Sequence, residues 1–187
     1  ANLLVHYCLE IQQGERLYIT TTTLAQPLVR EVYRVAMKAG AHIDIKMAFR
    51  EEAKIFLNHA NDDQLTHVSP LQKEAMENYD AYLAIRAPFN LKETQSVDPE
   101  QRKKRSKALS GINQTYFTRT ADRSLKRSLC QYPTQASAQE WVPRKFPSER
   151  PHPLQPSKIA NAVLEGDGVL NCKQLLKHPK LGEQWQL

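Results

Sequence analysis

The sequence predicts an α/β domain: an open, mostly parallel, doubly wound sheet with helices on both faces, followed by a marginal helical tail. Segments rich in aromatic and β-branched residues alternate along the chain with segments of helical periodicity. Two helical segments begin with a capping residue followed by proline, which is typical of helix N-termini. Because parallel neighbours need a crossover helix, this alternation favours a parallel sheet covered on both faces.

The expected elements follow from local patterns. In the first helix, residues 1–13, Leu4, Cys8 and Ile11 recur at spacings of four and three, and Gly14 is expected to end it. Further helices are expected at residues 25–39, 50–60, 69–78 and 98–121, with a short one from residue 133. Strands are expected near residues 16–21, 42–47, 81–86 and 125–132.

The composition changes near residue 140, so the α/β domain is assigned to residues 1–140. Residues 141–156 contain five prolines and are expected to form an extended linker. Residues 157–187 are expected to be a short helical or disordered tail, since two short helices bury little apolar surface.

Composition favours a soluble, cytoplasmic, globular protein: 41% of the residues are hydrophobic and 25% are charged. No apolar stretch approaches the roughly 18 residues of a membrane helix, and the N-terminus does not resemble a signal peptide. Cys8, Cys130 and Cys172 are far apart and form no Cys-x-x-Cys motif, so three reduced thiols are expected.

The net charge of +6 is concentrated in one segment. Residues 99–127 hold nine Lys or Arg and two acidic residues, a net of +7, so the rest of the chain sums to −1. The run from Arg102 to Lys107 could bind nucleic acid phosphates or another acidic partner through a basic helix at 99–121. Base-stacking aromatics are absent from this run, so a solvated helix face is the preferred interpretation and nucleic-acid binding is not expected.

A cluster of metal-ligand residue types occurs at His59, Asp62, Asp63 and His67. The two histidines are eight apart, whereas a helical pair of zinc ligands is usually four apart. A helix end followed by an Asp N-cap explains the pattern better, and no metal residue is assigned.

The threonines at residues 20–23 follow the first strand, in the loop where ligands gather in open α/β sheets. Helix N-termini there can hold anions, but phosphate binding normally needs glycines that this loop lacks. A capped helix start is therefore expected. A thiol pair between Cys130 and His42 is rejected, because the cysteine falls in a predicted buried strand. No catalytic or cofactor-binding residue is assigned.

Six stretches resemble a known family when taken in order. The longest is TTTLAQPLVREVYRVAMKAGAH at residues 21–42. The others are NLLVHYCLEIQQG at 2–14, SPLQKE at 69–74, NYDAYLAI at 78–85, VDPE at 97–100 and YPTQASAQE at 132–140. Together they resemble the N-terminal domain of the thermophilic metallo-aminopeptidases, the aminopeptidase T / aminopeptidase II family. Arg127 departs from the pattern, because an aromatic residue is more usual there.

The resemblance implies a homodimeric exopeptidase that removes N-terminal amino acids from peptides with two divalent ions of zinc, cobalt or manganese. The family's metal ligands lie in a C-terminal domain, and none of those motifs occurs here. The chain is therefore expected to be a truncated scaffold portion, inactive alone, with an unrelated tail after about residue 140. If the first helix borders the missing part, Leu3, Leu4, Val5, Ile11 and Leu17 are candidates for exposed apolar surface.

Overall fold

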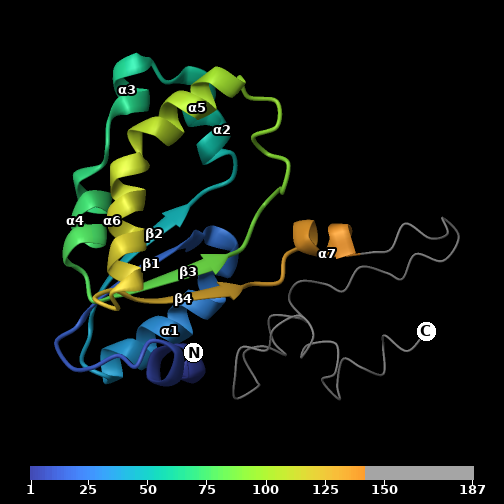
Figure 1. The fold of residues 1–187 in the computed structure, drawn as a ribbon. Coiled ribbons are helices and arrows are strands. Elements are labelled where there is room, and N and C mark those ends of the chain that lie inside the picture. The colour runs from blue at the N-terminus through green and yellow to red at the C-terminus, as the bar shows by residue number, and fades with distance from the viewer. Residues whose placement is uncertain (142–187) are drawn as a thin grey trace, which may run out of the picture.

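The computed structural model describes residues 1–141, which form a four-stranded sheet with helices on both faces (Figure 1). The strand order is β2-β1-β3-β4, and every neighbouring pair is parallel. The strands are β1 (Arg16–Thr22), β2 (His42–Ala48), β3 (Ala81–Arg86) and β4 (Lys126–Gln131). The predicted fold class is confirmed. The rest of the expected linker and the tail, residues 142–187, lie outside the described residues.

The crossovers divide the helices between the two faces. The first helix, η1 (Leu3–Cys8), and α1 (Gln26–Lys38) lie on one face, and a short 3-10 helix, η2 (Thr23–Ala25), leads into α1 (Figure 1). On the other face, α4 (Pro70–Asn78) and α6 (Ser110–Ala121) lie side by side. Three further helices, α2 (Glu52–His59), α3 (Asp62–Thr66) and α5 (Pro99–Ala108), cluster beyond the carboxyl end of the sheet. The chain described ends with α7 (Gln135–Trp141).

The core of the face under η1 and α1 is mainly aliphatic. Leu17 and Ile19 of β1 point into it together with Leu83 and Ile85 of β3, and all four are buried. They pack against the buried stripe Leu28, Val29, Val32 and Ala36 of α1. This layer contains most of the buried core residues. Burial of large aliphatic side chains is the main favourable term in folding, so the layer contributes most to stability.

The first helix differs from its prediction in length and in exposure. It is a π-helix that ends at Cys8, and Glu10 then adopts a left-handed conformation with φ 46°. The prediction that apolar residues of this region would be exposed is wrong, because Leu4, Val5, Ile11 and Leu17 all belong to the aliphatic core. Exposed large hydrophobic residues are found on several elements, among them Tyr7 of η1, Leu71 of α4 and Phe49 after β2.

The single helix predicted at 98–121 is two helices that meet at Leu109. The Leu109 N–H bonds to the carbonyls of both Arg105 and Lys107, so the turn tightens there. The Ser110 hydroxyl also donates to the Lys107 carbonyl at 2.7 Å. Serine and glycine at positions 110 and 111 weaken a helix, since serine competes for backbone bonds and glycine adds backbone freedom.

Candidate functional site

The candidate site lies at the carboxyl end of the sheet, between β1 and β3. The connection after β1 runs along one face through α1, and the connection after β3 runs over the other through α5 and α6 (Figure 1). Adjacent strands whose connections diverge mark the topological switch point, where ligands bind in open α/β sheets. Backbone pairing between the two strands ends at Thr20 and Ala84, so the chains separate beyond that point.

Two threonine hydroxyls join the separating strand ends. Thr21 Oγ1 donates to the Ile85 carbonyl at 3.0 Å, and Thr22 Oγ1 donates to the Ala87 carbonyl at 2.5 Å. Thr22 Oγ1 also accepts from the Leu24 N–H at 3.4 Å and so caps η2, as expected for this loop. Both hydroxyl protons are donated to backbone carbonyls. The Thr21 and Thr22 hydroxyls therefore have no proton left to donate to a bound anion.

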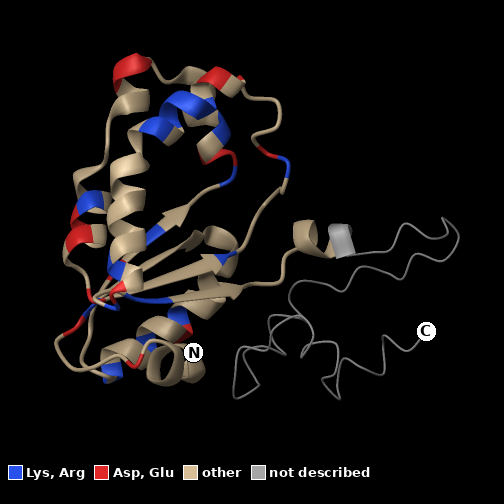
Figure 2. Cartoon of the chain, in the orientation of Figure 1, with Lys and Arg blue, Asp and Glu red and all other residues tan. Residues whose placement is uncertain are grey.

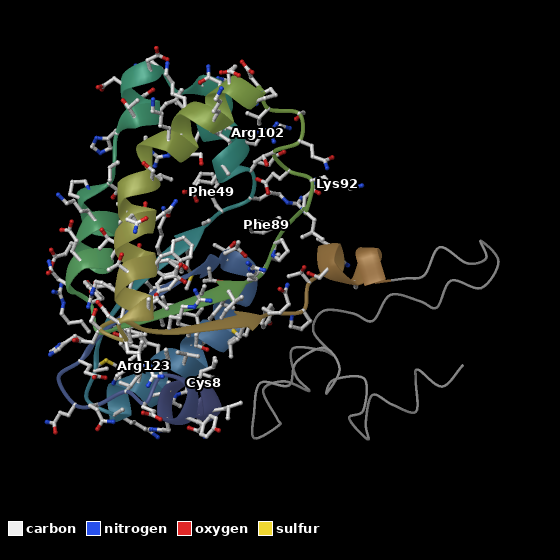
Figure 3. All side chains as sticks on the ribbon, viewed as in Figure 1. Cys8, Phe49, Phe89, Lys92, Arg102 and Arg123 are labelled. Atoms are coloured by element: carbon white, nitrogen blue, oxygen red, sulfur yellow. The ribbon has the colours of Figure 1, made fainter. Side chains whose placement is uncertain are left out.

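Aromatic and cationic side chains surround the switch point. The Arg50 guanidinium, which follows β2, lies 5.8 Å from the ring centroid of Phe89, which follows β3. Because β1 lies between those two strands, this contact spans the end of β1. Phe49 is exposed in the same region (Figure 3), as are Leu24 after β1 and Leu91 after β3.

A tight turn places Phe49 and Arg50 at this edge. The Phe49 N–H donates to the Glu52 carboxylate at 3.2 Å, and the Glu52 N–H returns a bond to the Phe49 carbonyl at 3.3 Å. Glu51 completes the turn in a left-handed conformation with φ 64°. A left-handed conformation costs a non-glycine residue roughly 1–2 kcal/mol of conformational free energy. The two hydrogen bonds between Phe49 and Glu52 stabilise the turn against this cost.

The sheet face under α4 and α6 carries a polar row that sequence reasoning missed. The register aligns Asp44, Tyr18, Tyr82 and Arg127 across β2, β1, β3 and β4. The rings of Tyr18 and Tyr82 stack with centroids 6.1 Å apart. The alternation of Leu17 and Ile19 with tyrosine could have indicated a polar opposite face, but only the register shows that four strands contribute.

Arg127, the residue that departs from the family pattern, takes part in this row through α6. Its guanidinium donates to the Tyr116 hydroxyl at 3.0 Å and lies 5.7 Å from the Tyr116 ring centroid. The Tyr116 ring meets the edge of Tyr82 at 5.6 Å. A cation over an aromatic face is attracted by the ring quadrupole, so arginine is compatible with an aromatic layer here.

The other end of the row is held by Tyr79, which follows α4. Its hydroxyl donates to the Asp44 carboxylate, and the Arg16 guanidinium lies 4.1 Å from its ring centroid while pairing with Glu74 at 3.1 Å. Burial raises the pKa of Tyr79, and the bond to Asp44 raises it further. Burial likewise raises the pKa of Tyr18. These phenols therefore keep their protons at neutral pH, and the Tyr79 hydroxyl acts as a structural hydrogen-bond donor.

The metal-ligand types noted near residue 60 serve local structure. The N-cap of α3 is Asn61, not an aspartate as expected, and it forms a capping box with Gln64. The Asp62 carboxylate pairs with Lys104 at 2.5 Å, and the Asp63 carbonyl accepts the His67 N–H at 2.9 Å. Within residues 1–141, no group of three or more His, Cys, Asp or Glu side chains is arranged to hold a metal ion.

Lys and Arg residues are concentrated on α5 (Figure 2), and two of them are engaged within the fold. Arg105 donates to the carbonyls of Leu65 at 3.1 Å and His67 at 2.5 Å, and its guanidinium lies 5.2 Å from the Phe56 ring centroid. It thereby joins α5 to α2 and to the end of α3. The preferred interpretation of α5 as a solvated helix face was therefore incomplete. Through Arg105, the helix also stabilises its packing against α2 and α3.

The remaining cations of α5 differ in their surroundings. Lys104 pairs with Asp62, and Lys103 lies 4.0 Å from a Glu100 carboxylate oxygen. Arg102 and Lys107 are exposed and have no ion-pair partner among the described residues. Two free cations on a short helix provide a much smaller electrostatic footprint than the sequence run suggested.

Cys130 and His42 are far from forming a thiol pair. Cys130 belongs to β4 and His42 to β2, which are the two opposite edges of the sheet. Burial raises the pKa of the Cys130 thiol to about 11. The thiol is therefore protonated and unreactive at neutral pH, as expected for a structural cysteine.

The strand order and the two helical layers define a doubly wound α/β domain. A family model described as thermophilic metalloprotease (M29) matches residues 1–165, and the chain belongs to this family. The matched range passes residue 140, where the resemblance was expected to end. No relative of the chain is found among the curated proteins.

A solved structure has the same fold. Wild-type AmpT from Thermus thermophilus is similar over 88% of this chain, with a TM-score of 0.65 and 16% sequence identity. The similar part is 40% of the AmpT chain, so this chain spans less than half the length of its structural relative. None of the helices described is long and apolar enough to cross a membrane.

Proposed function

We propose that this chain is the N-terminal scaffold portion of a metal-dependent aminopeptidase, an enzyme that removes N-terminal amino acids from peptides. Membership of the thermophilic metalloprotease family carries the proposal. The similarity to AmpT supports the proposal. The similar part is 40% of the AmpT chain, so more than half of such an enzyme remains to supply the reaction centre.

The side chains described do not fit a catalytic metal centre. Catalytic zinc usually takes three protein ligands and keeps one open position. Residues 1–141 bring together no such set, and of the candidate residues near α3 the Asp62 carboxylate pairs with Lys104. No catalytic step is therefore derived from this part of the chain. In the proposed enzyme, two ions of zinc, cobalt or manganese are bound elsewhere.

Three further attributes belong to the proposal. The enzyme is a homodimer, it acts on peptides, and it is cytoplasmic. The cytoplasmic assignment is supported by the free thiols of Cys8 and Cys130, since disulfides are rare in that compartment. The alternative is a non-enzymatic module that binds nucleic acid or another acidic partner through α5. In its favour are Arg102 and Lys107, which are exposed and have no ion-pair partner within residues 1–141.

An activity assay tests the proposal. We expect the purified 187-residue chain to hydrolyse no leucine p-nitroanilide, with or without zinc, cobalt or manganese. Joining the chain to the C-terminal, metal-binding part of an M29 enzyme should restore metal-dependent turnover that a chelator abolishes. Chelator-sensitive turnover by the chain alone would contradict the scaffold role. Salt-dependent binding of duplex DNA without any turnover in the joined protein would favour the alternative.

A further inference from the structure

The rim of the switch point combines unpaired cations with exposed apolar groups. Arg50 and Lys92 are exposed there and make no ion pair among the described residues. Phe49 is 56% exposed and Leu91 is 49% exposed. Figure 3 shows Phe49, Phe89 and Lys92 in one region, between the sheet and the helices α2 and α5.

The acidic residues that follow Arg50 have other partners. Glu51 lies 3.9 Å from Lys54 within α2, and Glu52 accepts the Phe49 N–H at the helix start. The Arg50 guanidinium carbon lies 5.8 Å from the Phe89 ring centroid instead. Its N–H groups make no hydrogen bond or ion pair among the described residues, so they can bind a carboxylate.

The threonine hydroxyls at this edge are already engaged within the fold. Thr21 Oγ1 donates to the Ile85 carbonyl and Thr22 Oγ1 donates to the Ala87 carbonyl, so neither is assigned to the ligand. The rim thus offers an exposed guanidinium next to exposed apolar side chains. Its complement is an anionic group next to an apolar side chain, and this combination is the chemistry of the last residue of a peptide.

We infer that the Arg50 and Phe89 pair, with Phe49 beside it, binds the C-terminal carboxylate and apolar last side chain of a peptide. The inference rests on the proposed function, because it names the substrate class that the scaffold portion would hold: short peptides with a free, apolar C-terminus. Arg50 binds the carboxylate through charge-assisted hydrogen bonds. Phe49 and Leu91 cover the side chain. Arg50 is a binding residue and takes no part in bond cleavage.

Binding is measured on the 187-residue chain with N-acetyl-Ala-Ala-Phe, whose blocked amine removes any dependence on an aminopeptidase centre. Chemical-shift titration should show saturable binding in the millimolar range, with the Arg50 side-chain N–H and the amides of Phe49 and Phe89 shifting most. The matched C-terminal amide should bind about tenfold or more weakly, since a charged hydrogen bond is lost. Free phenylalanine should also bind more weakly, because its ammonium group next to the carboxylate is repelled by Arg50 and Lys92.

Two arginine variants locate the site. Arg50→Gln should weaken the acid peptide about tenfold or more and abolish its preference over the amide. Arg123→Gln is the matched control, because Arg123 is also exposed but lies at the opposite end of the sheet (Figure 3). It should bind like the parent chain. The amide spectrum of each variant checks that the fold is intact.

Several results would overturn the inference. They are equal binding of acid and amide, parent-like binding by the Arg50 variant, no binding at 10 millimolar peptide (a concentration set on the order of weak surface affinities), or equal binding of free phenylalanine. These results do not affect the scaffold proposal. That proposal is tested by metal-dependent turnover after the chain is joined to the metal-binding part of an M29 enzyme. Loss of that turnover with carboxylate-selective binding intact would refute the proposed function alone.

Discussion

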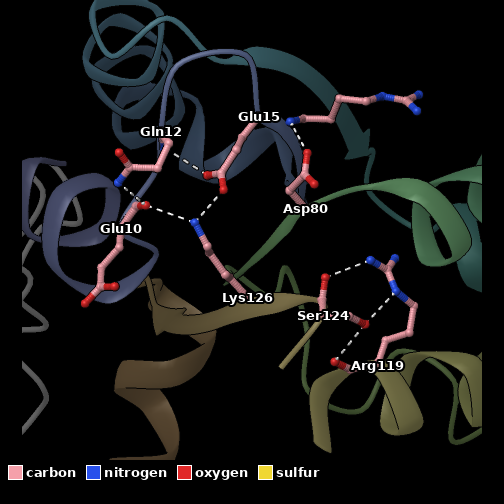
Figure 4. Close-up of polar contacts among 8 residues, drawn as sticks. Glu10, Gln12, Glu15, Asp80, Arg119, Ser124 and Lys126 are labelled. Carbon is pink, nitrogen blue, oxygen red and sulfur yellow. Dashed lines mark hydrogen bonds and ion pairs between the residues drawn. The ribbon is translucent and has the colours of Figure 1, made fainter. Parts of the chain in front are cut away.

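Lys126 Nζ lies 2.6 Å from a Glu15 carboxylate oxygen, although the two residues are 111 positions apart in sequence (Figure 4). Lys126 begins β4, and Glu15 directly precedes β1. The same ammonium group donates to the Glu10 carbonyl at 3.0 Å, and the other Glu15 oxygen accepts the Gln12 N–H at 2.8 Å. This network attaches the segment after η1 to the far edge of the sheet.

Replacing Lys126 by methionine should lower the free energy of unfolding by about 1–2 kcal/mol. The side chains of Lys126 and Glu15 are only 32% and 21% exposed, so the pair is less screened than a surface ion pair. Urea unfolding measures the change. A double-mutant cycle with Glu15→Gln should show that the two substitutions are not additive.

The matched control is Lys103→Met, because Lys103 and Glu100 are 4.0 Å apart and 79% and 77% exposed. Its urea midpoint should equal that of the parent chain. Equal destabilisation by both lysine substitutions would show that loss of charge, rather than the Glu15 contact, is responsible.

Arg123→Gly should stabilise the protein by roughly 0.5–1 kcal/mol. Arg123 follows the C-cap of α6 with φ 66°, a left-handed conformation that glycine adopts without a steric penalty. The gain is measured by thermal or urea unfolding. Arg123→Ala removes the same charge but keeps a Cβ, so it should give no such gain. Equal stabilisation by alanine would assign the effect to charge and contradict the conformational explanation.

The buried Cys130 thiol should make the folded state less stable at alkaline pH. Its pKa is raised from 9.0 to about 11, so the unfolded chain loses this proton at lower pH than the folded chain. The contribution is constant below about pH 9 and is lost as pH rises towards 11, by about 2–3 kcal/mol in total.

Comparison with Cys130→Val isolates this effect, because tyrosines and lysines titrate equally in both proteins. The free energy of unfolding should fall less steeply with pH above 9 in the variant. Parallel curves for the two proteins between pH 8 and 11 would show that the thiol is already accessible in the folded state.

Arg105→Lys should destabilise the chain by about 1–2 kcal/mol, although it conserves the charge. The Arg105 guanidinium donates to two carbonyls and lies over the Phe56 ring, and an ammonium group cannot reproduce that planar arrangement. Arg102→Lys on the same helix is the control and should leave stability unchanged. Faster hydrogen exchange in α3 of the Arg105 variant alone would locate the effect. Identical exchange in both variants would contradict it.

Local sequence patterns predicted the strands well because alternation is a property of neighbouring residues. Leu17 and Ile19 enter the aliphatic core as their pattern indicates, and Gln26–Lys38 is helical within one residue of its expected limits. The helix break at Leu109 was missed, since serine and glycine after it are tolerated in many helices. The π-helical turn of η1 was missed because a hydrophobic stripe does not specify the hydrogen-bonding period.

The candidate site was not predicted from the sequence. For the loop after the first strand a capped helix start was preferred over a ligand site, and the Thr22 side chain does cap η2. Arg50 and Phe89 carry no motif, and they are 39 positions apart. Their contact depends on β1 lying between β2 and β3, which is a question of strand order and not of composition.

The sequence by itself determined the class of fold, the identity of most elements and the concentration of positive charge in one segment. These properties depend on side-chain periodicity and composition, which act over a few residues. Only the tertiary structure decided that Arg105 joins α5 to α2 and α3 and that Arg127 joins an aromatic row. It also decided that Arg50 lies at the switch point without an ion-pair partner among the described residues. The reason is physical: an arginine acquires its role from the carbonyls, rings and carboxylates that the strand register brings within a few ångströms, and those partners are distant in sequence.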